Sequence, residues 1–319
     1  MKVEKRRIKL QMGIILAFTF LLAGITMFFI WSNNKQAVIT AGQFTLIGDK
    51  PVIIKKGKVY EYEADGVWRQ TELAGKAKQI VRGEKLCVLM EDGSLYYEKE
   101  TDLEEELPLT SAYSLYMAEK ALKVNKEEAF AWINQSLEYL GFMALLRNGD
   151  ILYQGPGEFE RYRMDKGAPI FLSGSYILTS QGNVYYLEIG TDDSNGTMSI
   201  NMICVYDGKD IVTISASESA ARCLGLRKDG TVISWSDIAP LKVMDWKNVI
   251  AIQQGFDYAV GLTAKGRVLF VDYNTSTTEK VTKALEMWTD VVQIASYSDT
   301  IVGFKRDGSC LFLNIGEYR

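Results

Sequence analysis

One short unit recurs seven times along this 319-residue chain and limits the folds open to it. Each copy places one glycine between two runs rich in Val, Ile, Leu, Tyr and Phe. The seven glycines are Gly57, Gly93, Gly149, Gly182, Gly230, Gly266 and Gly308. Their mean spacing is about 42 residues, a period typical of propeller blades.

The last two copies are the most alike. Residues 246–271 align without a gap with residues 288–313, so that Trp246 falls on Trp288 and Gly266 on Gly308. Weaker copies cover residues 44–63, 78–97, 139–155, 170–189 and 210–235. Agreement of residue types over a whole unit predicts a repeat architecture.

The unit has the composition of a β-hairpin. Glycine after Asp, Asn or Lys supplies the positive φ of a tight primed turn. A third apolar run precedes the hairpin, as in residues 249–252 and 291–294, and residues 67–70 indicate a fourth in the links. The runs are apolar throughout, as expected of sheets buried on both faces. We therefore predict an all-β, seven-bladed propeller of four-stranded blades over residues 37–319.

Two further segments complete this interpretation. The last unit ends soon after its hairpin, so we expect residues 37–40 to supply its outer strand and to close the ring. The segment Thr110–Phe130 accounts for the longest gap between copies. Its sequence is compatible with a short amphipathic helix or with an added pair of strands. In either case it is a binding insertion or a plain connector between two units.

The N-terminus predicts a membrane anchor. No charged residue occurs from Leu10 to Trp31, a run of 22 residues, and a spanning helix needs about 20. Residues 1–9 carry five basic residues and one acidic residue. The positive-inside rule then places residues 1–9 in the cytoplasm and everything after residue 31 outside, with 32–36 as a linker. A cleaved signal peptide is the alternative, although its apolar core is usually only about 7–15 residues.

The remaining chain is acidic. Residues 35–319 hold 31 Lys and Arg against 39 Asp and Glu, a net charge of −8. Such a body is a poor match for nucleic-acid backbones. The absence of histidine excludes imidazole-based triads and His-containing zinc sites.

Other candidate chemistry favours ordinary structural roles. Cys87, Cys204, Cys223 and Cys310 form no CxxC pair, and buried packing is expected for the three that lie in predicted strands, although an even count permits disulfides. The loop 191–197 resembles a calcium loop only faintly, and the adjacent carboxylates of 102–106 are not a glycosidase pair. Residues 155–157 do not form a phosphate loop. We therefore expect no catalytic, metal or cofactor residue.

The repeat resembles that of the regulator of chromosome condensation family. Residues 248–252 with Gly255, and Asp229-Gly230-Thr231-Val232 with Trp235, carry this resemblance. The likeness covers about residues 37–316, and it departs from the family in lacking histidine and in reading Trp235-Ser236 where the family has Trp-Gly. The family implies a seven-bladed propeller, but it does not imply one function. The degenerate style of these repeats resembles that of bacterial, membrane-anchored members.

These observations predict a membrane-anchored, extracytoplasmic interaction module that binds a protein or an envelope component. Two alternatives stay open. One is a surface hydrolase with an Asp or Glu pair in the central depression, and the other is a structural part of an envelope assembly.

Overall fold

The computed structural model describes residues 43–81, 87–97, 130–134, 143–154, 159–191, 198–217, 222–236 and 242–319. They belong to one compact unit spanning residues 41–319. The predicted anchor (10–31), its flanking segments, the predicted strand 37–40 and residues 110–129 of the insertion lie outside the described residues. Within the described residues, no helix is both long and apolar enough to cross a membrane.

The described residues form seven antiparallel sheets, three of which have four strands. The first sheet contains β1 (Phe44–Ile47), β2 (Lys50–Lys55), β3 (Lys58–Tyr62) and β4 (Trp68–Gln70). The third contains β8 (Phe130–Asn134), β9 (Met143–Leu146), β10 (Asp150–Gln154) and β11 (Phe159–Arg163). The fourth contains β12 (Pro169–Ser173), β13 (Tyr176–Thr179), β14 (Val184–Thr191) and β15 (Met198–Tyr206).

The other four sheets have three described strands each. The second contains β5 (Ala77–Val81), β6 (Cys87–Met90) and β7 (Leu95–Tyr97). The fifth contains β16 (Ile211–Ala216), β17 (Arg222–Arg227) and β18 (Val232–Ser236). The sixth contains β19 (Val249–Gln254), β20 (Tyr258–Thr263) and β21 (Val268–Asp272), and the seventh contains β22 (Val291–Tyr297), β23 (Thr300–Lys305) and β24 (Cys310–Asn314).

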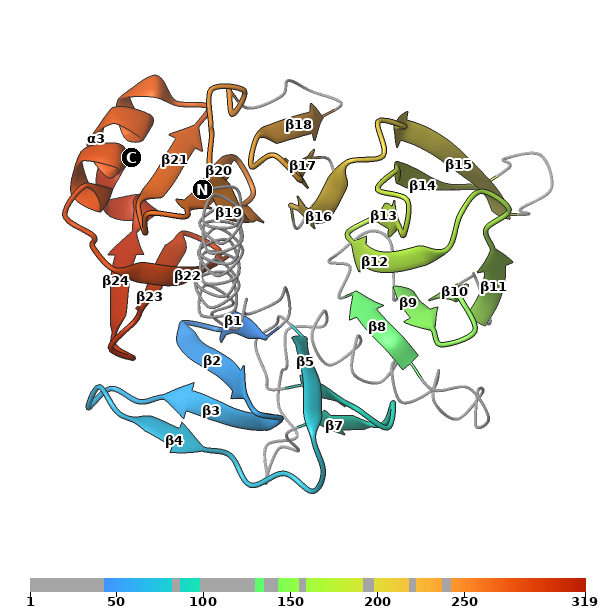
Figure 1. Cartoon of the computed structure of the whole chain (residues 1–319), viewed down its shortest axis with the longest axis horizontal. Helices are drawn as coiled ribbons and strands as arrows, with labels where there is room; N and C mark the ends of the chain where they lie inside the picture. Colours follow the sequence, from blue (N-terminus) through green and yellow to red (C-terminus); the bar gives the residue numbers. More distant parts are fainter. Residues whose placement is uncertain are drawn as a thin grey trace, which may run out of the picture. The chain divides into compact units, whose positions relative to one another are not determined.

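The sheets follow one another around a closed ring (Figure 1). The first strand of each sheet lies innermost, and every innermost strand contacts the next one, ending with β22 against β1. Apolar side chains fill the space between neighbouring sheets, for example Val232 of the fifth sheet with Val249 and Ile252 of the sixth. This arrangement defines a β-propeller, and it confirms the predicted repeat and the burial of both faces of the central strands.

The expectation of four strands in every blade is wrong for the sixth sheet. After β21 the chain forms the helix α3 (Thr275–Leu285). The Asn274 side chain caps α3 by accepting hydrogen bonds from the backbone N–H groups of Ser276 and Thr277, and Val281 and Leu285 bury its inner face. A capped amphipathic helix therefore takes the place of an outer strand. The chain ends in the short 3-10 helix η1 (Ile315–Tyr318).

The seven repeat glycines all have positive φ, as predicted, but only one of their seven turns is primed. In the turn of Lys56 and Gly57 both residues have positive φ. In the other six turns only the glycine does, which is the pattern of a type I turn followed by a bulge. The carboxylates of Asp92, Asp229 and Asp307 favour this turn, because each accepts the N–H and hydroxyl of the residue two positions later.

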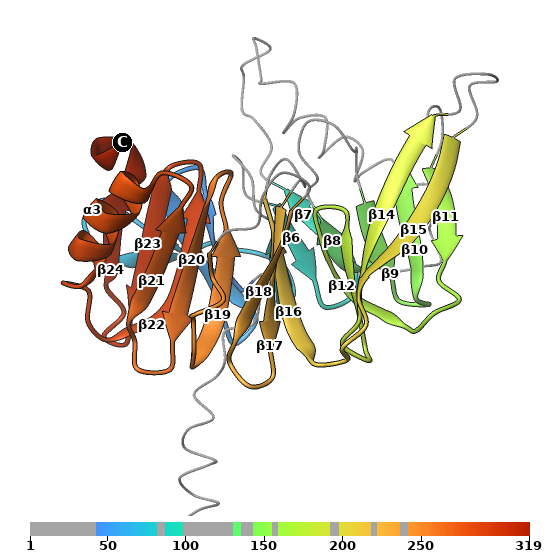
Figure 2. The ribbon, with the colours of Figure 1, turned by 90° about the horizontal axis from the view of Figure 1, so that it is seen from above.

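These turns all lie on one side of the propeller, which we call the turn face. It comprises the seven glycine turns and the links that lead from one sheet to the next. Glycine and link touch there: the Gly57 carbonyl accepts the N–H of Ala77, and the Gly230 carbonyl accepts that of Val249. The connections between the first and second strands define the opposite face, and Figure 2 shows the strands running between the two.

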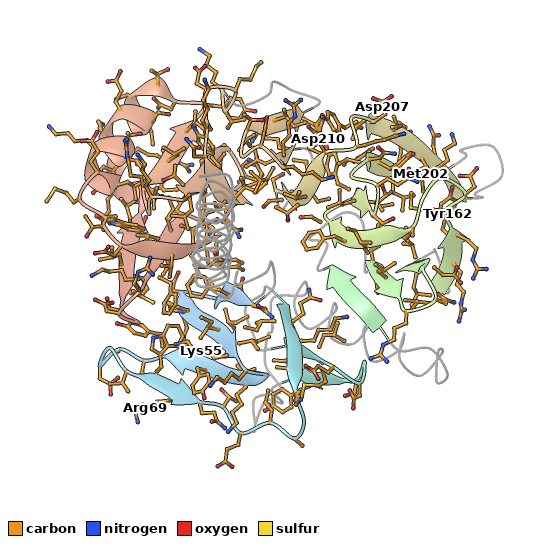
Figure 3. All side chains as sticks on the ribbon, in the orientation of Figure 1. Lys55, Arg69, Tyr162, Met202, Asp207 and Asp210 are labelled. Atoms are coloured by element: carbon orange, nitrogen blue, oxygen red, sulfur yellow. The ribbon has the colours of Figure 1, made fainter. Side chains whose placement is uncertain are left out.

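Aromatic side chains close the ring between the seventh and first sheets. The ring of Phe304 lies 5.6 Å from that of Phe44 and 5.6 Å from that of Trp68. The Lys55 ammonium lies 5.1 Å from the centre of the Phe304 ring and 5.2 Å from that of Trp68 (Figure 3). Because residues 37–40 are not described, whether they add a strand to β24 stays a prediction.

Candidate functional site

The innermost strands carry no acidic side chain. Asp and Glu are absent from β1, β5, β8, β12, β16, β19 and β22. A propeller hydrolase without histidine would need two facing carboxylates near the axis, and the described inner strands do not supply them. Among the described residues, no group of three or more Cys, Asp or Glu side chains is placed to hold a metal ion.

The cysteines are described in part. Cys204, Cys223 and Cys310 are free thiols. Cys223 is fully buried, as expected, and burial raises the pKa of its thiol well above the usual value. Cys310 is half-buried, and burial raises its pKa to about 12. Cys204 is exposed on β15, and the side chain of Cys87 lies outside the description.

The remaining predicted motifs fall largely outside the described residues. Thr191 ends β14, and residues 192–197 of the calcium-like loop are not described. The same applies to the acidic cluster 102–106 and to the glycine pair around Pro156. Their expected roles as loops stay predictions.

An exposed aromatic group stands out on the opposite face. Phe256, in the turn between β19 and β20, is 59% exposed, and Tyr273, just after β21, is 38% exposed. The Arg222 guanidinium lies 4.2 Å from the centre of the Tyr273 ring and 6.0 Å from that of Phe256. Arg222, Phe256 and Tyr273 form what we call the Phe256 patch.

Backbone contacts hold the Phe256 patch in shape. Arg222 begins β17 in the fifth sheet, and its side chain donates a hydrogen bond to the carbonyl of Phe256 in the sixth. The N–H of Tyr273 donates to the carbonyl of Asp257 at 3.3 Å. The side chain of Gln254, which is fully buried, donates to the carbonyls of Gly255 and Tyr258 on either side of the turn. The exposed rings are therefore carried on a braced turn.

An ion cluster borders the patch. Arg319 lies 2.5 Å from Asp257, 3.1 Å from Asp299 and 3.4 Å from Asp272. Burial opposes the positive charge, but the three carboxylates outweigh it and raise the pKa of Arg319. The cluster ties the end of the chain to the sixth and seventh sheets, so it fixes the turn that carries Phe256.

Sequence reasoning missed this patch. Its three residues come from three separate connections, and no repeat position links them. One signal was present: in Gly255-Phe256-Asp257 an aromatic residue occupies a turn between two largely apolar strands, where it has no core to fill. Arg and aromatic residues are enriched at protein interfaces, so the patch has the composition of a contact surface.

Comparisons with known proteins give structures but no sequence family. No family model matches the chain, and no curated protein matches it. The CRINKLY WD40 ectodomain of the Arabidopsis thaliana receptor kinase ACR4 is similar over 86% of this chain and 95% of its own, at 12% identity and a TM-score of 0.49. Prp20p of Saccharomyces cerevisiae is similar over 86% of this chain and 72% of its own, at 11% identity and a TM-score of 0.43.

A third similar structure is BBS1N, solved in complex with ARL6DN, over 85% of this chain and 90% of its own, at 11% identity and a TM-score of 0.47. These likenesses carry no residue role or partner to this chain. The class of protein is defined by its own seven sheets and closed ring, which make it a β-propeller repeat protein.

Proposed function

We propose that this chain is an interaction module whose propeller binds a protein partner through the Phe256 patch. The observation that carries the proposal is the pairing of two exposed aromatic rings with an arginine on a braced turn. Such groups provide binding energy without a large entropic cost, because the turn is already ordered before a partner arrives.

Affinity capture tests the proposal directly. Full-length, tagged protein solubilised from the host membrane is compared with its Phe256→Ala variant, and the captured proteins are quantified by mass spectrometry. A hot-spot residue contributes about 2 kcal/mol or more, so a specific partner should fall at least tenfold with Phe256→Ala. Arg222→Ala should lower capture of the same partner.

A matched control separates contact from general surface loss. Phe312 on β24 is 50% exposed, so Phe312→Ala removes a similar ring from another part of the propeller. A partner lost with Phe256→Ala and retained with Phe312→Ala supports the proposal. A partner retained by both variants, or lost equally from both, contradicts it.

We also propose that residues 10–31 anchor the propeller outside a bacterial cell membrane. The uncharged run and the basic segment before it support this location. An uncleaved anchor leaves the mature chain at 35.9 kDa in the membrane fraction after carbonate washing. A shorter chain released from the membrane would instead identify a cleaved signal peptide, and protease resistance of the propeller in intact cells would contradict the outward orientation.

A further inference from the structure

The turn face exposes apolar side chains that nothing in the described chain covers. Met287 and Met244 are 83% and 81% exposed, the highest values among the large exposed apolar residues. Both lie in links on the turn face, Met244 two residues before Trp246 and Met287 one residue before Trp288. Two protruding thioethers in successive links give this face flexible apolar side chains that can contact another apolar phase.

A second apolar group lies near the axis of the same face. Each of six innermost strands shifts register at its second residue, and this bulge displaces that residue from the ladder. In three consecutive sheets the displaced residue is a large, exposed aliphatic one: Ile170, Val212 and Ile250. The bulges therefore extend the apolar surface of the turn face inward.

Basic residues surround these apolar groups. Among the described residues, the exposed Lys and Arg side chains of the turn face outnumber its exposed acids, although residues 35–319 are acidic overall. The basic residues are Lys55, Lys56, Lys58, Lys76, Arg147, Lys166, Lys209, Lys228, Lys242, Lys247, Lys265, Arg267 and Arg306. The acidic ones are Glu72, Glu91, Asp92, Asp165, Asp207, Asp229, Asp245, Glu286, Asp290 and Asp307.

The opposite face has the reverse balance. Its exposed or half-exposed acids include Asp49, Glu63, Asp65, Asp257, Asp299 and Glu317, and its basic residues include Lys50, Arg222 and Arg319. Several of those basic residues are already paired: Lys50 with Glu61 and Glu63, and Arg319 with its three carboxylates. In the part of the chain that the structure describes, the charge balance of the two faces therefore differs in sign, and the turn face is the one that suits an anionic surface.

The chain also enters the propeller at this face. Gln43, the first described residue, accepts the N–H of Ile54 through its carbonyl at 2.7 Å, beside the Lys56 and Gly57 turn. The chain between positions 31 and 43 spans at most about 40 Å. If residues 10–31 are in a bilayer, as their sequence predicts, the turn face is within reach of the lipid surface.

We propose that the turn face docks on an anionic phospholipid surface, with Met244 and Met287 entering the headgroup region and the lysines neutralising phosphates. Apolar side chains that reach the acyl boundary and basic residues near anionic lipid both strengthen such binding. Docking in this way leaves the Phe256 patch on the far side of the propeller, free for a protein partner.

Methionine oxidation measures this docking without new labels. Full-length protein is reconstituted in vesicles of phosphatidylcholine alone or with phosphatidylglycerol, exposed to chloramine-T, and analysed by peptide mass spectrometry. Water-exposed methionines oxidise readily to the sulfoxide. The part-exposed Met202 on β15 serves as the internal reference (Figure 3). Relative to Met202, the oxidation rates of Met244 and Met287 should fall about tenfold when the vesicles contain phosphatidylglycerol. High salt should restore them.

A charge-reversal pair distinguishes lipid docking from other causes of protection. Lys247→Glu with Lys265→Glu should restore oxidation of both methionines in phosphatidylglycerol vesicles. Lys50→Glu with Lys280→Glu makes the same charge change away from the turn face and should leave them protected. Equal oxidation in both lipids would overturn the proposal. The proposal would also be overturned if Met244 and Met287 were as well protected from oxidation in phosphatidylcholine or in detergent as in phosphatidylglycerol. That result would show that a second copy or another protein covers the face.

Discussion

The indole N–H of Trp68 donates a hydrogen bond to the backbone carbonyl of Gly308 at 2.6 Å, across 240 residues of sequence. At several other junctions the carbonyl of the turn glycine accepts a backbone N–H from the start of the next sheet, as Gly230 does from Val249. Between the seventh and first sheets a side chain from β4 supplies that donor. At the ring closure, the Trp68 side chain therefore makes the hydrogen bond to the turn glycine that a backbone N–H makes at those other junctions.

Trp68→Phe tests this hydrogen bond. The phenyl ring keeps contact with Phe304 and Tyr62 but cannot donate, so the free energy of unfolding should fall by about 1 kcal/mol. Trp68→Ala also removes the ring and should cost about 3 kcal/mol. Urea unfolding followed by circular dichroism measures both. Val67→Ala, at the exposed neighbour of Trp68, should change stability little, and an equal loss there would contradict the assignment.

The turn glycines have a second role besides positive φ. A Cβ on Gly182 would lie 2.7 Å from the carbonyl carbon of Lys209 in the link to the fifth sheet, whereas a Cβ on Gly149 would meet nothing within 4 Å. Both glycines have φ between 84° and 88°. Gly149→Ala should therefore cost about 1 kcal/mol, for backbone strain alone.

Gly182→Ala adds a clash with rigid backbone and should cost about 3 kcal/mol. Thermal unfolding of the two variants, measured side by side, isolates the contact between sheets. If both melt at the same temperature, close packing between turn and link is not important to stability.

The sequence predicted the glycines and strands because both are local features. A glycine between two β-branched runs is sufficient to place a hairpin, and the match of Trp246 with Trp288 has a physical cause. A Cβ on Gly261 or Gly303 would lie 2.7 Å from the ring of Trp246 or Trp288, respectively. Each tryptophan thus covers a glycine of the middle strand, and the two positions recur together.

The features that sequence reasoning missed depend on distant or competing interactions. Residues 275–278 read Thr-Ser-Thr-Thr, which favours strand over helix, yet the Asn274 cap and the burial of Val281 and Leu285 outweigh that preference. The junction of Trp68 with Gly308 and the meeting of Arg222 with Tyr273 depend on closure of the ring and on the packing of neighbouring sheets. No spacing along the chain encodes either contact.

A buried carboxylate makes stability depend on pH. Asp150 is buried and accepts hydrogen bonds from Arg163 Nε at 2.5 Å and Nη2 at 3.0 Å. The hydrogen bond from Arg163 lowers the pKa of Asp150, although burial opposes it. A lowered folded-state pKa stabilises the fold above the unfolded value of about 3.9, and this contribution disappears as the pH falls through the folded value.

Asp150→Asn should therefore cost about 1 kcal/mol at pH 7, since Arg163 is largely exposed and solvent screens the pair. The difference from the parent protein should shrink below about pH 4. Urea titrations at pH 7, 5 and 3 measure it, with Asp165→Asn as a control at an exposed carboxylate. A difference that stays constant with pH would show that Asp150 acts through packing and not through its charge.

The free cysteines should differ in reactivity by location. Cys204 is exposed on β15, whereas Cys223 is fully buried and its thiol pKa is raised well above normal by burial. Because the thiolate is the reactive form, iodoacetamide at pH 8 should modify Cys204 in the native protein and Cys223 only after denaturation. Peptide mass spectrometry measures both. If Cys223 in the native protein were modified as fast as Cys204, the fifth sheet would have to open readily. If neither cysteine reacted after denaturation without reductant, the two would be held in disulfides.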